Sequence, residues 1–451
     1  MNKLIYSTLL LASISSYAQS HNDVQTGYFV IDGARTLLEK IHKEKKFTID
    51  HPTSKGYEVY GPKELKSWLT QNSPFPFYSL DTKEKEKSLS TYPTPEEIGE
   101  KLKVLAKENP DIFKLFSIGK TENNRDLWVM KVSDNVEVDE VEPEFKYVAN
   151  MHGDEIVGRE MLVSLLNEIA SNYKSGDKET LSLVNNTEIF IMPSLNPDGA
   201  ASKRRGNGNW RDLNRDFPDV VRDAKSFFSS GSIFDNAYVD HQKETLAMME
   251  FQKSRHFALS ANFHGGTEVV NYPWDTKKDD FPYKDLVVDL SREYAVKIPS
   301  MRDNREFVDG IVNGYDWYEI NGGMQDWSYH WHQDLQVTIE LSHSKWPTYD
   351  VVPSYYDKNR DSLFQYMKSI HQGFGVQIKN VEKFTVKISS IQNGKENLID
   401  TISVPGNEFY KVLSEGQYKV QILANGINKV LDINVKKDQI SNNGNFISIL
   451  K

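Results

Sequence analysis

The feature that most constrains the fold is an alternation of strand-like and helix-like segments between residues 94 and 199. Helices with one apolar face separate short runs of strand-forming residues. The strand-like runs cover 114–118, 127–132 and 187–193 together with one beginning at Phe145, and the helices begin at 94 and 158. This pattern is typical of α/β proteins. We therefore predict an α/β fold with a central sheet and helices on both faces.

Two of these helices carry additional signals. Thr94 can cap the first helix, Pro95 suits its first helical position, and Glu97 can complete a capping box. The second helix, predicted over 158–173, gathers its apolar residues on one face. Asn-Pro-Asp-Gly at 196–199 predicts a turn after the fourth strand.

The strand that begins at Phe145 runs into a turn carrying His152 and Glu155. Three residues is a metal-ligand spacing, and an imidazole with a carboxylate suits zinc. Catalytic zinc typically keeps three protein ligands and a water, with two histidines and one glutamate as a known set. The pair alone also fits an ordinary solvated turn, so the metal hypothesis needs a third ligand.

His264 is the best candidate for that third ligand. It follows a run of strand-forming residues and precedes two glycines that force a turn. The carboxyl ends of strands in open, mostly parallel sheets form the ligand crevice, so residues distant in sequence can meet there. We predict one zinc ion bound by His152, Glu155 and His264.

Glu340 interrupts the apolar strand predicted over 335–341. A glutamate within a buried strand costs free energy unless it is paired or functional. If its carboxylate faces the zinc, it could accept a proton from the metal-bound water. We therefore predict that Glu340 is the general base.

The segment 204–219 is dense in Arg and Asn side chains. Arginine is well suited to gripping a carboxylate through two hydrogen bonds, so this segment fits recognition of a substrate carboxyl group. A charged surface loop would have the same composition.

The N-terminus and the composition indicate an exported protein. A short apolar run after Lys3, followed by Ser-Tyr-Ala at 16–18, is typical of a secretory signal peptide cleaved after about Ala18. The chain of 451 residues contains no Cys, so an apolar core rather than disulfides must stabilise it. No later stretch has the pattern of a transmembrane helix. We predict a secreted or periplasmic protein of bacterial type.

The formal net charge of −10 argues against nucleic-acid binding, which needs a basic face. It is compatible with a cationic substrate.

The length predicts more than one structural unit. Residues 19–88 form an N-terminal extension with helices predicted at 34–44 and 62–71, either a removable pro-segment or a structural subdomain. Near residue 381 the pattern changes to short alternating segments separated by glycine-containing turns, which predicts a small β-sandwich.

Together these motifs resemble those of the zinc metallocarboxypeptidases of the carboxypeptidase A superfamily, in particular the regulatory branch with carboxypeptidases E, N, M and D. The resemblance runs from about 92 to 374, and its motifs lie at 152–155, 196–199, 212–219, 259–266, 322–326 and 338–342. It implies a mixed central sheet in a catalytic domain at 89–376. Residues 410–420 resemble the transthyretin-like β-sandwich of this branch, which implies such a domain at 377–451.

The resemblance also implies roles for individual residues. Arg205 matches the arginine that polarises the scissile carbonyl. Asn214 and Arg215 match the pair that holds the substrate's C-terminal carboxylate. Tyr318 matches the tyrosine that closes over the bound residue, and Asp212 matches the acid that orients the first zinc histidine. Core packing for Tyr318 and loop capping for Asp212 are the alternatives.

Substrate preference is implied by two positions. Asp275 matches the aspartate that meets a terminal Lys or Arg in the regulatory branch, and Gln325 occupies the other specificity position. A buried carboxylate facing a cation would discriminate strongly, whereas a solvated turn is the alternative for Asp275. The expected activity is hydrolysis of the C-terminal peptide bond of peptides and proteins.

Two other functions stay open at this point. The signal peptide admits a peptidoglycan stem-peptide carboxypeptidase, because diaminopimelate also offers an amine and a carboxylate. A non-catalytic peptide-binding homologue is the alternative from another class, although the predicted catalytic residues are all present. A zinc amidohydrolase would share the metal site but not the motif at 322–326 or the β-sandwich.

Overall fold

The computed structural model describes residues 26–44, 46–80, 92–223, 241–437 and 439–449. It contains two units, Met1–Ser88 and Leu89–Lys451. The predicted signal peptide, residues 1–18, lies outside the described residues. None of the helices in the described parts combines the length and the apolar composition that a bilayer span requires.

The first unit is built on a four-stranded antiparallel sheet in the order β2-β3-β1-β4. Its elements are β1 (Thr26–Val30), α1 (Leu38–His42), β2 (Thr48–Thr53), β3 (Gly56–Gly61), α2 (Leu65–Asn72) and β4 (Phe77–Ser79). The sequence analysis predicted the two helices, of which α1 is shorter than expected, but not the sheet. The apolar side chains of Val30, Val59 and Leu65 pack in one core.

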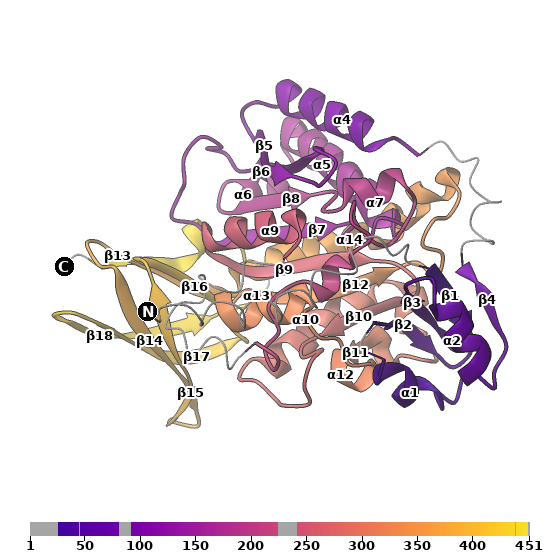
Figure 1. The fold of residues 1–451 in the computed structure, drawn as a ribbon. Coiled ribbons are helices and arrows are strands. Elements are labelled where there is room, and N and C mark those ends of the chain that lie inside the picture. Colours follow the sequence, from indigo (N-terminus) through magenta and orange to yellow (C-terminus); the bar gives the residue numbers. More distant parts are fainter. Residues whose placement is uncertain (1–25, 45, 81–91, 224–240, 438, 450–451) are drawn as a thin grey trace, which may run out of the picture. The chain divides into compact units, whose positions relative to one another are not determined.

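The second unit contains a mixed eight-stranded sheet in the order β11-β10-β12-β9-β7-β8-β6-β5 (Figure 1). Its strands are β5 (Phe113–Lys120), β6 (Asp126–Val132), β7 (Glu144–Ala149), β8 (Glu188–Met192), β9 (Phe257–His264), β10 (Glu268–Tyr272), β11 (Ile311–Asn313) and β12 (Leu335–Leu341). Strands β12, β9, β7 and β8 run parallel, and β6 and β10 pair antiparallel with this group. The predicted mixed α/β sheet is confirmed.

Helices cover both faces of this sheet. Along β7, Phe145 and Tyr147 join one apolar cluster, and Val148 joins another on the opposite face. Residues alternate in this way because successive side chains of a strand point to opposite faces. The first cluster includes side chains of α4 (Pro95–Glu108), α5 (Val157–Ser175), α10 (Lys284–Val296) and α14 (Val352–Lys368), and the second those of α9 (Lys243–Lys253) and α13 (Met324–His332).

Local signals explain several helix ends. The predicted capping box of α4 is confirmed, because the Thr94 hydroxyl accepts from the Glu97 N–H at 3.2 Å and the Glu97 carboxylate accepts from the Thr94 N–H at 2.7 Å. The turn predicted at 196–199 is instead the start of a short helix, α7 (Pro197–Ala201). Asn196 caps it by accepting from the Gly199 N–H at 2.8 Å, and proline suits the first helical position.

The other α-helices in the described part of the second unit are short. They are α6 (Lys178–Val184), α11 (Pro299–Arg302) and α12 (Gly314–Trp317).

The C-terminal part of this unit is all-β. Its strands form a three-stranded sheet, β16-β13-β19, and a four-stranded sheet, β15-β14-β17-β18. They are β13 (Gly373–Ile378), β14 (Lys383–Gln392), β15 (Lys395–Pro405), β16 (Glu408–Val412), β17 (Gly416–Ala424), β18 (Ile427–Val435) and β19 (Phe446–Ile449). Buried residues of both sheets belong to the same apolar cluster as α5 and α14. Strand β13 begins before the boundary predicted at residue 377.

Candidate active site

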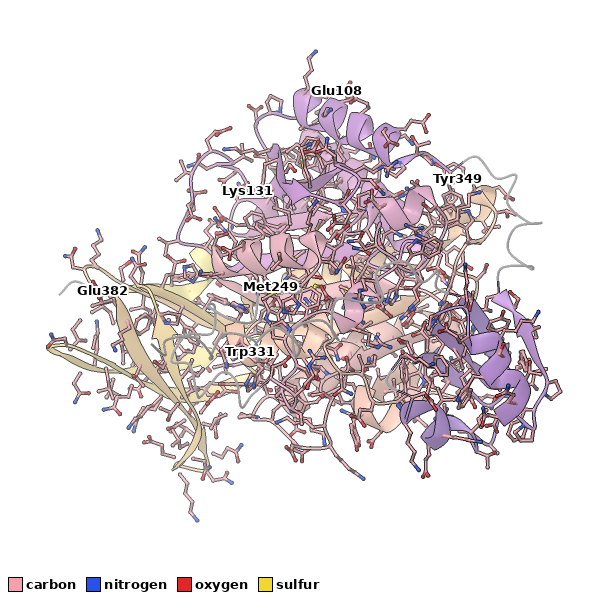
Figure 2. All side chains as sticks on the ribbon, viewed as in Figure 1. Glu108, Lys131, Met249, Trp331, Tyr349 and Glu382 are labelled. Atoms are coloured by element: carbon pink, nitrogen blue, oxygen red, sulfur yellow. The ribbon has the colours of Figure 1, made fainter. Side chains whose placement is uncertain are left out.

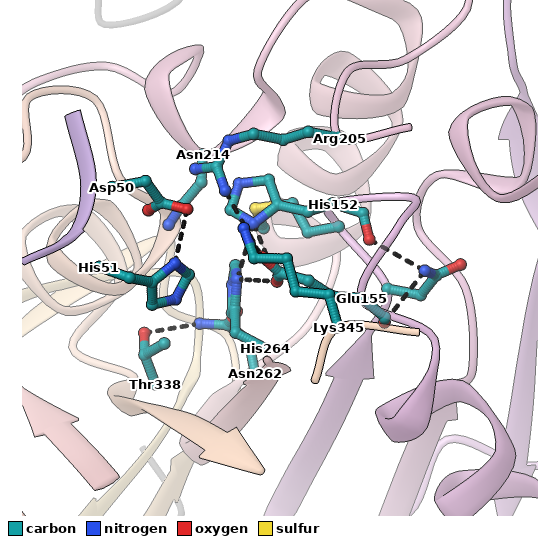
Figure 3. Close-up of polar contacts among 12 residues, drawn as sticks. Asp50, His51, His152, Glu155, Arg205, Asn214, Asn262, His264, Thr338 and Lys345 are labelled. Carbon is teal, nitrogen blue, oxygen red and sulfur yellow. Dashed lines mark hydrogen bonds and ion pairs between the residues drawn. The ribbon is translucent and has the colours of Figure 1, made fainter. Parts of the chain in front are cut away.

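Three predicted metal ligands meet at the carboxyl ends of β7 and β9 (Figure 3). His152 and Glu155 lie in the turn after β7, and His264 is the last residue of β9. A Glu155 carboxylate oxygen lies 3.0 Å from Nδ1 of His152 and 2.9 Å from Nδ1 of His264, and the two Nδ1 atoms are 3.0 Å apart. All three side chains are buried. The structure thus brings His264 to His152 and Glu155, which lie more than a hundred positions earlier in the chain.

The side chain of Asn150 shapes the turn that carries His152 and Glu155. Its amide Nδ2 donates to the carbonyl oxygens of His152, Gly153 and Glu155 at 2.9, 3.2 and 3.2 Å. Its own backbone has a φ of 55°, in the left-handed region that asparagine tolerates better than most residues. This residue was not singled out from the sequence, because an asparagine after a strand is a common turn residue.

A close backbone approach fixes the same turn against α7. A Cβ on Gly153 would lie 2.1 Å from the carbonyl carbon of Gly199, so only glycine fits. The Gly153 N–H donates to the carbonyl oxygen of Arg205 at 3.1 Å, and Asn196 Nδ2 donates to that same oxygen at 3.1 Å. The backbone that carries Arg205 is therefore tied directly to the turn that carries His152.

Asp212 lies behind His152. Its Oδ1 is 3.0 Å from His152 Nε2, and its Oδ2 accepts from Arg205 Nε at 2.9 Å. Burial raises the pKa of Asp212, but Arg205 and His152 outweigh burial and hold it well below its usual range. An ionised Asp212 accepts the Nε2 proton of His152, which leaves Nδ1 as the nitrogen that faces Glu155 and His264.

The carboxylate of Glu155 also faces two cations. Its Oε1 lies 3.4 Å from a guanidinium nitrogen of Arg205 and 3.4 Å from Nζ of Lys345. Burial raises the pKa of Glu155, yet His152, Lys345 and His264 hold it well below the usual range. Lys345 was missed in the sequence analysis, since a single lysine in the loop after β12 looks like a surface residue.

Glu340 lies beside His264. The two residues are register partners on the parallel strands β12 and β9, so their side chains share one face of the sheet. The Glu340 side chain is 3% exposed. The structure therefore places the predicted general base next to the metal-ligand cluster.

A second group of predicted residues surrounds Asp275. Gln325 Nε2 and Asn271 Nδ2 donate to Asp275 Oδ1 at 3.1 and 3.0 Å. The side-chain oxygens of Gln325 and Asn271 are themselves buried and have no hydrogen-bond partner among the described residues. Burial raises the pKa of Asp275 to about 6, against the opposing effects of the Asn271 hydrogen bond and the Arg215 charge.

Asn214 and Arg215 are connected to this second group through backbone contacts. Asn214 Oδ1 accepts from the Met324 N–H at 3.0 Å, next to Gln325. The carbonyl oxygen of Arg215 would lie 2.6 Å from a Cβ on Gly322, which has a φ of 79° and therefore also favours glycine. The segments at 212–219 and 322–326 are thus packed together.

Two buried acids that the sequence analysis did not select hold this arrangement. Asp326 accepts from the backbone N–H groups of Asp275 and Thr276 at 2.9 to 3.0 Å. Asp219 accepts from the Thr276 hydroxyl at 2.9 Å and from the Gly322 N–H at 3.0 Å. Both lie inside predicted motifs, but a sequence does not distinguish an acid that binds backbone from one that binds substrate.

Tyr318 directly follows α12 and is 8% exposed. It packs in a small apolar cluster with Val269, Phe307, Trp317 and Ile320. The role of Tyr318 over the bound substrate stays a prediction.

Comparison with known proteins connects this geometry to a family. The model of the zinc carboxypeptidase family matches residues 98–362. Mouse (Mus musculus) carboxypeptidase M is 38% identical over 352 residues, which cover 72% of this chain and 76% of that protein. The chain belongs to the zinc carboxypeptidase family. The members of this family are zinc metallopeptidases, which are hydrolases.

Human (Homo sapiens) carboxypeptidase D is 37% identical to this zinc carboxypeptidase over 364 residues, or 75% of the chain. The chain spans about a quarter of the length of that relative. The fold is also similar to crystal structures of thrombin activatable fibrinolysis inhibitor and of carboxypeptidase A from Helicoverpa armigera. Their TM-scores are 0.56 and 0.58 at 18% identity, and each alignment covers 76% of this chain and at least 96% of the other.

The donor set of this zinc carboxypeptidase fits its metal. Two imidazole nitrogens and a carboxylate oxygen lie about 3 Å apart, close to the separation of about 3.3 Å between ligands of a tetrahedral zinc. The close approach of the two Nδ1 atoms is unfavourable for neutral imidazoles that both present lone pairs. A cation between them removes this repulsion.

Proposed function

We propose that this zinc carboxypeptidase removes C-terminal Lys or Arg residues from peptides and proteins. The observation that carries the proposal is the Asp275 carboxylate, which is 1% exposed. The amides of Asn271 and Gln325 that donate to it also carry buried oxygens with no hydrogen-bond partner among the described residues. A buried carboxylate without a cation is costly, and a lysine ammonium or an arginine guanidinium supplies both the charge and the donors. The resemblance to the regulatory branch supports the same preference.

We propose that His152, Glu155 and His264 hold the zinc. When bound there, zinc supplies a Lewis acid that polarises a carbonyl oxygen and lowers the pKa of water. Asp212 orients His152, and Arg205 and Lys345 balance the charge of Glu155.

The chain's own residues supply the remaining steps. Glu340 accepts a proton from the attacking water and donates it to the leaving amine. The Arg205 guanidinium, held by Asp212, stabilises negative charge that develops on the scissile carbonyl oxygen. Asn214 and Arg215 bind the terminal carboxylate, which restricts cleavage to the last peptide bond.

We propose that the enzyme acts outside the cytoplasm, in the periplasm or the surrounding medium. The support is the signal-peptide pattern of residues 1–18. Residues 19–88 are proposed as an N-terminal extension, 89–376 as the catalytic domain and 377–451 as a transthyretin-like domain.

The test compares two acylated dipeptides, one ending in Arg and one in Phe, with and without a zinc chelator. We expect the full chain to release Arg much faster than Phe, and we expect the chelator to abolish release until zinc is restored. Preference for Phe would reject Asp275 as the specificity residue. Cleavage of neither dipeptide, combined with release of the terminal residue from a peptidoglycan stem peptide, would identify the alternative substrate.

The preference for Arg should depend on pH. The pKa of Asp275 is raised to about 6, so the carboxyl group binds a proton and loses its charge as the pH falls through that value. We expect the ratio of kcat/KM for Arg to that for Phe to fall between pH 7 and pH 5, mainly through a higher KM for Arg. The ratio cancels pH effects on the zinc site, and a ratio that does not change would contradict the assignment.

A further inference from the structure

A second group of acidic side chains lies away from the zinc site, in the segment that joins β6 to β7. Asp134, Glu140 and Glu142 each place one carboxylate oxygen within 4.8 Å of the others. Asp134 is exposed, Glu140 is half-buried, and Glu142 is only 5% exposed. The group therefore opens to solvent at one side and is closed at the other.

Two oxygens of this group have no partner. Oε2 of Glu140 and Oε2 of Glu142 are both inaccessible to solvent, and neither forms a hydrogen bond with any described residue. Removing a carboxyl oxygen from water without a compensating hydrogen bond or cation is unfavourable. The buried oxygens of the group therefore have no hydrogen-bond donor among the described residues.

In a neighbouring acidic group of the same fold, cationic side chains provide partners for the buried carboxylate oxygens. One Arg255 guanidinium nitrogen lies 2.5, 2.7 and 2.5 Å from carboxylate oxygens of Asp139, Glu144 and Glu188. Lys131, labelled in Figure 2, adds a second cation at 2.5 Å from Glu188.

No Lys or Arg of the described residues forms an ion pair with Asp134, Glu140 or Glu142. The two adjacent groups thus differ in one respect. Lys and Arg side chains form ion pairs with the first group, whereas the second has no such ion pair among the described residues, although the charge of Lys131 acts on Glu142 from farther away.

We infer that Asp134, Glu140 and Glu142 form a binding site for Ca²⁺. Calcium takes six to eight oxygen ligands, binds carboxylates in one- or two-oxygen modes and tolerates irregular geometry. Magnesium requires a near-ideal octahedron and gives up its water reluctantly, so two long glutamate side chains on one loop suit calcium better. The exposed side, at Asp134, leaves room for water to complete the coordination.

The protonation of Glu142 is consistent with this site. Burial, followed by the charges of Glu140, Asp134 and Glu188, raises the pKa of Glu142 to about 8, although Lys131 acts in the opposite direction. At neutral pH the Glu142 carboxyl of the calcium-free protein therefore holds a proton, and a bound Ca²⁺ takes the place of that proton.

The site is placed to order the zinc-binding strand. The segment with Glu140 and Glu142 continues directly into β7, which begins at Glu144 and runs to the turn carrying His152. A calcium ion would hold the start of this strand, so its expected effect is on stability rather than on the chemical step.

The test measures binding of Ca²⁺ to the zinc-loaded full chain after exhaustive dialysis against calcium-free buffer containing zinc. Equilibrium dialysis with ⁴⁵Ca²⁺ should show one ion per chain with a Kd in the range of about 10⁻⁶ to 10⁻³ M, and Mg²⁺ at the same concentration should compete poorly. The midpoint of thermal unfolding should rise when Ca²⁺ is added.

Two variants and a matched control distinguish a specific site from general attraction to an acidic surface. Glu142→Gln and Asp134→Asn should each weaken binding by about tenfold or more, because affinity follows the number of ligand charges. Asp134 is exposed, so its replacement should leave the fold intact. Glu137→Gln removes the same charge from an exposed residue of the same loop that pairs with Lys114 at 2.5 Å, and it should bind Ca²⁺ normally.

The inference is overturned if the native chain binds no Ca²⁺ up to millimolar concentration, or if all three variants bind it equally. Neither outcome bears on the proposed peptidase activity, because binding and melting are measured without a peptide substrate.

Discussion

Glu340→Gln is expected to lower kcat by about a hundredfold or more while zinc stays bound. The side chain sits in register with His264 and is almost fully buried, so a proton transferred between water and the leaving amine has a carboxylate available at that position. Glutamine has the same shape but cannot accept the proton, and general acid–base catalysis contributes about 10² to 10⁴ in rate. Steady-state kinetics with an Arg-terminated dipeptide measures the loss.

The zinc content of the variant decides whether the loss is chemical. It should equal that of the native chain, since Glu340 is not among the three proposed ligands. A control is Glu268→Gln, which changes another buried glutamate on the adjacent strand β10, where it pairs with Lys358 at 2.8 Å. This control should affect stability and leave kcat nearly unchanged. A Glu340→Gln enzyme with native kcat would reject the general-base role.

Asp275→Asn is expected to lower kcat/KM for Arg-terminated peptides by about two to three orders of magnitude. The change keeps the shape of the side chain and removes the charge that we propose meets the cation of the substrate. Loss of one partner of a buried charge pair costs about 2–5 kcal/mol. The kcat/KM for a Phe-terminated peptide should change little or increase, because no buried carboxylate then remains to be desolvated.

Two further variants make the specificity test sharper. Gly314→Ala should also weaken the preference for Arg, because its Cβ would lie 1.7 Å from Asp275 Oδ1 and must displace that carboxylate. Asp316→Asn, which removes an exposed charge two residues later, should change neither substrate. Equal losses for Arg and Phe in the Asp275 variant would indicate a damaged site rather than a specificity residue.

The central sheet was predictable because its strands are short apolar runs that end in recognisable turns. The observed β12 has the predicted limits, and the glutamate that interrupts its apolar pattern was conspicuous for that reason. The N-terminal sheet was missed because strand β2 contains Asp50, His51 and Pro52, which mask any alternating pattern. Strand prediction depends on such alternation, and a short strand with a proline lacks it.

The parts of the site that sequence could not provide are those created by packing. Lys345 and Asn150 are ordinary loop residues until the fold brings one to Glu155 and turns the other's amide toward three carbonyl groups. Asp326 is in a predicted motif, but only the structure reveals that it binds the backbone of Asp275. Spacing along a chain reports neighbours in a turn, not partners that meet across a sheet.

The shared apolar cluster of the catalytic sheet and the C-terminal strands has a consequence for how the second unit comes apart. Phe384 and Val386 of the β-sandwich belong to the same continuous core as Leu335 and Tyr366. Lys411 of β16 adds a hydrogen bond to the side chain of Gln333 at 3.0 Å. Loss of either part would expose the buried face of the other to water. The two parts should therefore unfold in one cooperative transition. The C-terminal strands thus stabilise the catalytic sheet and should not fold as a separable domain.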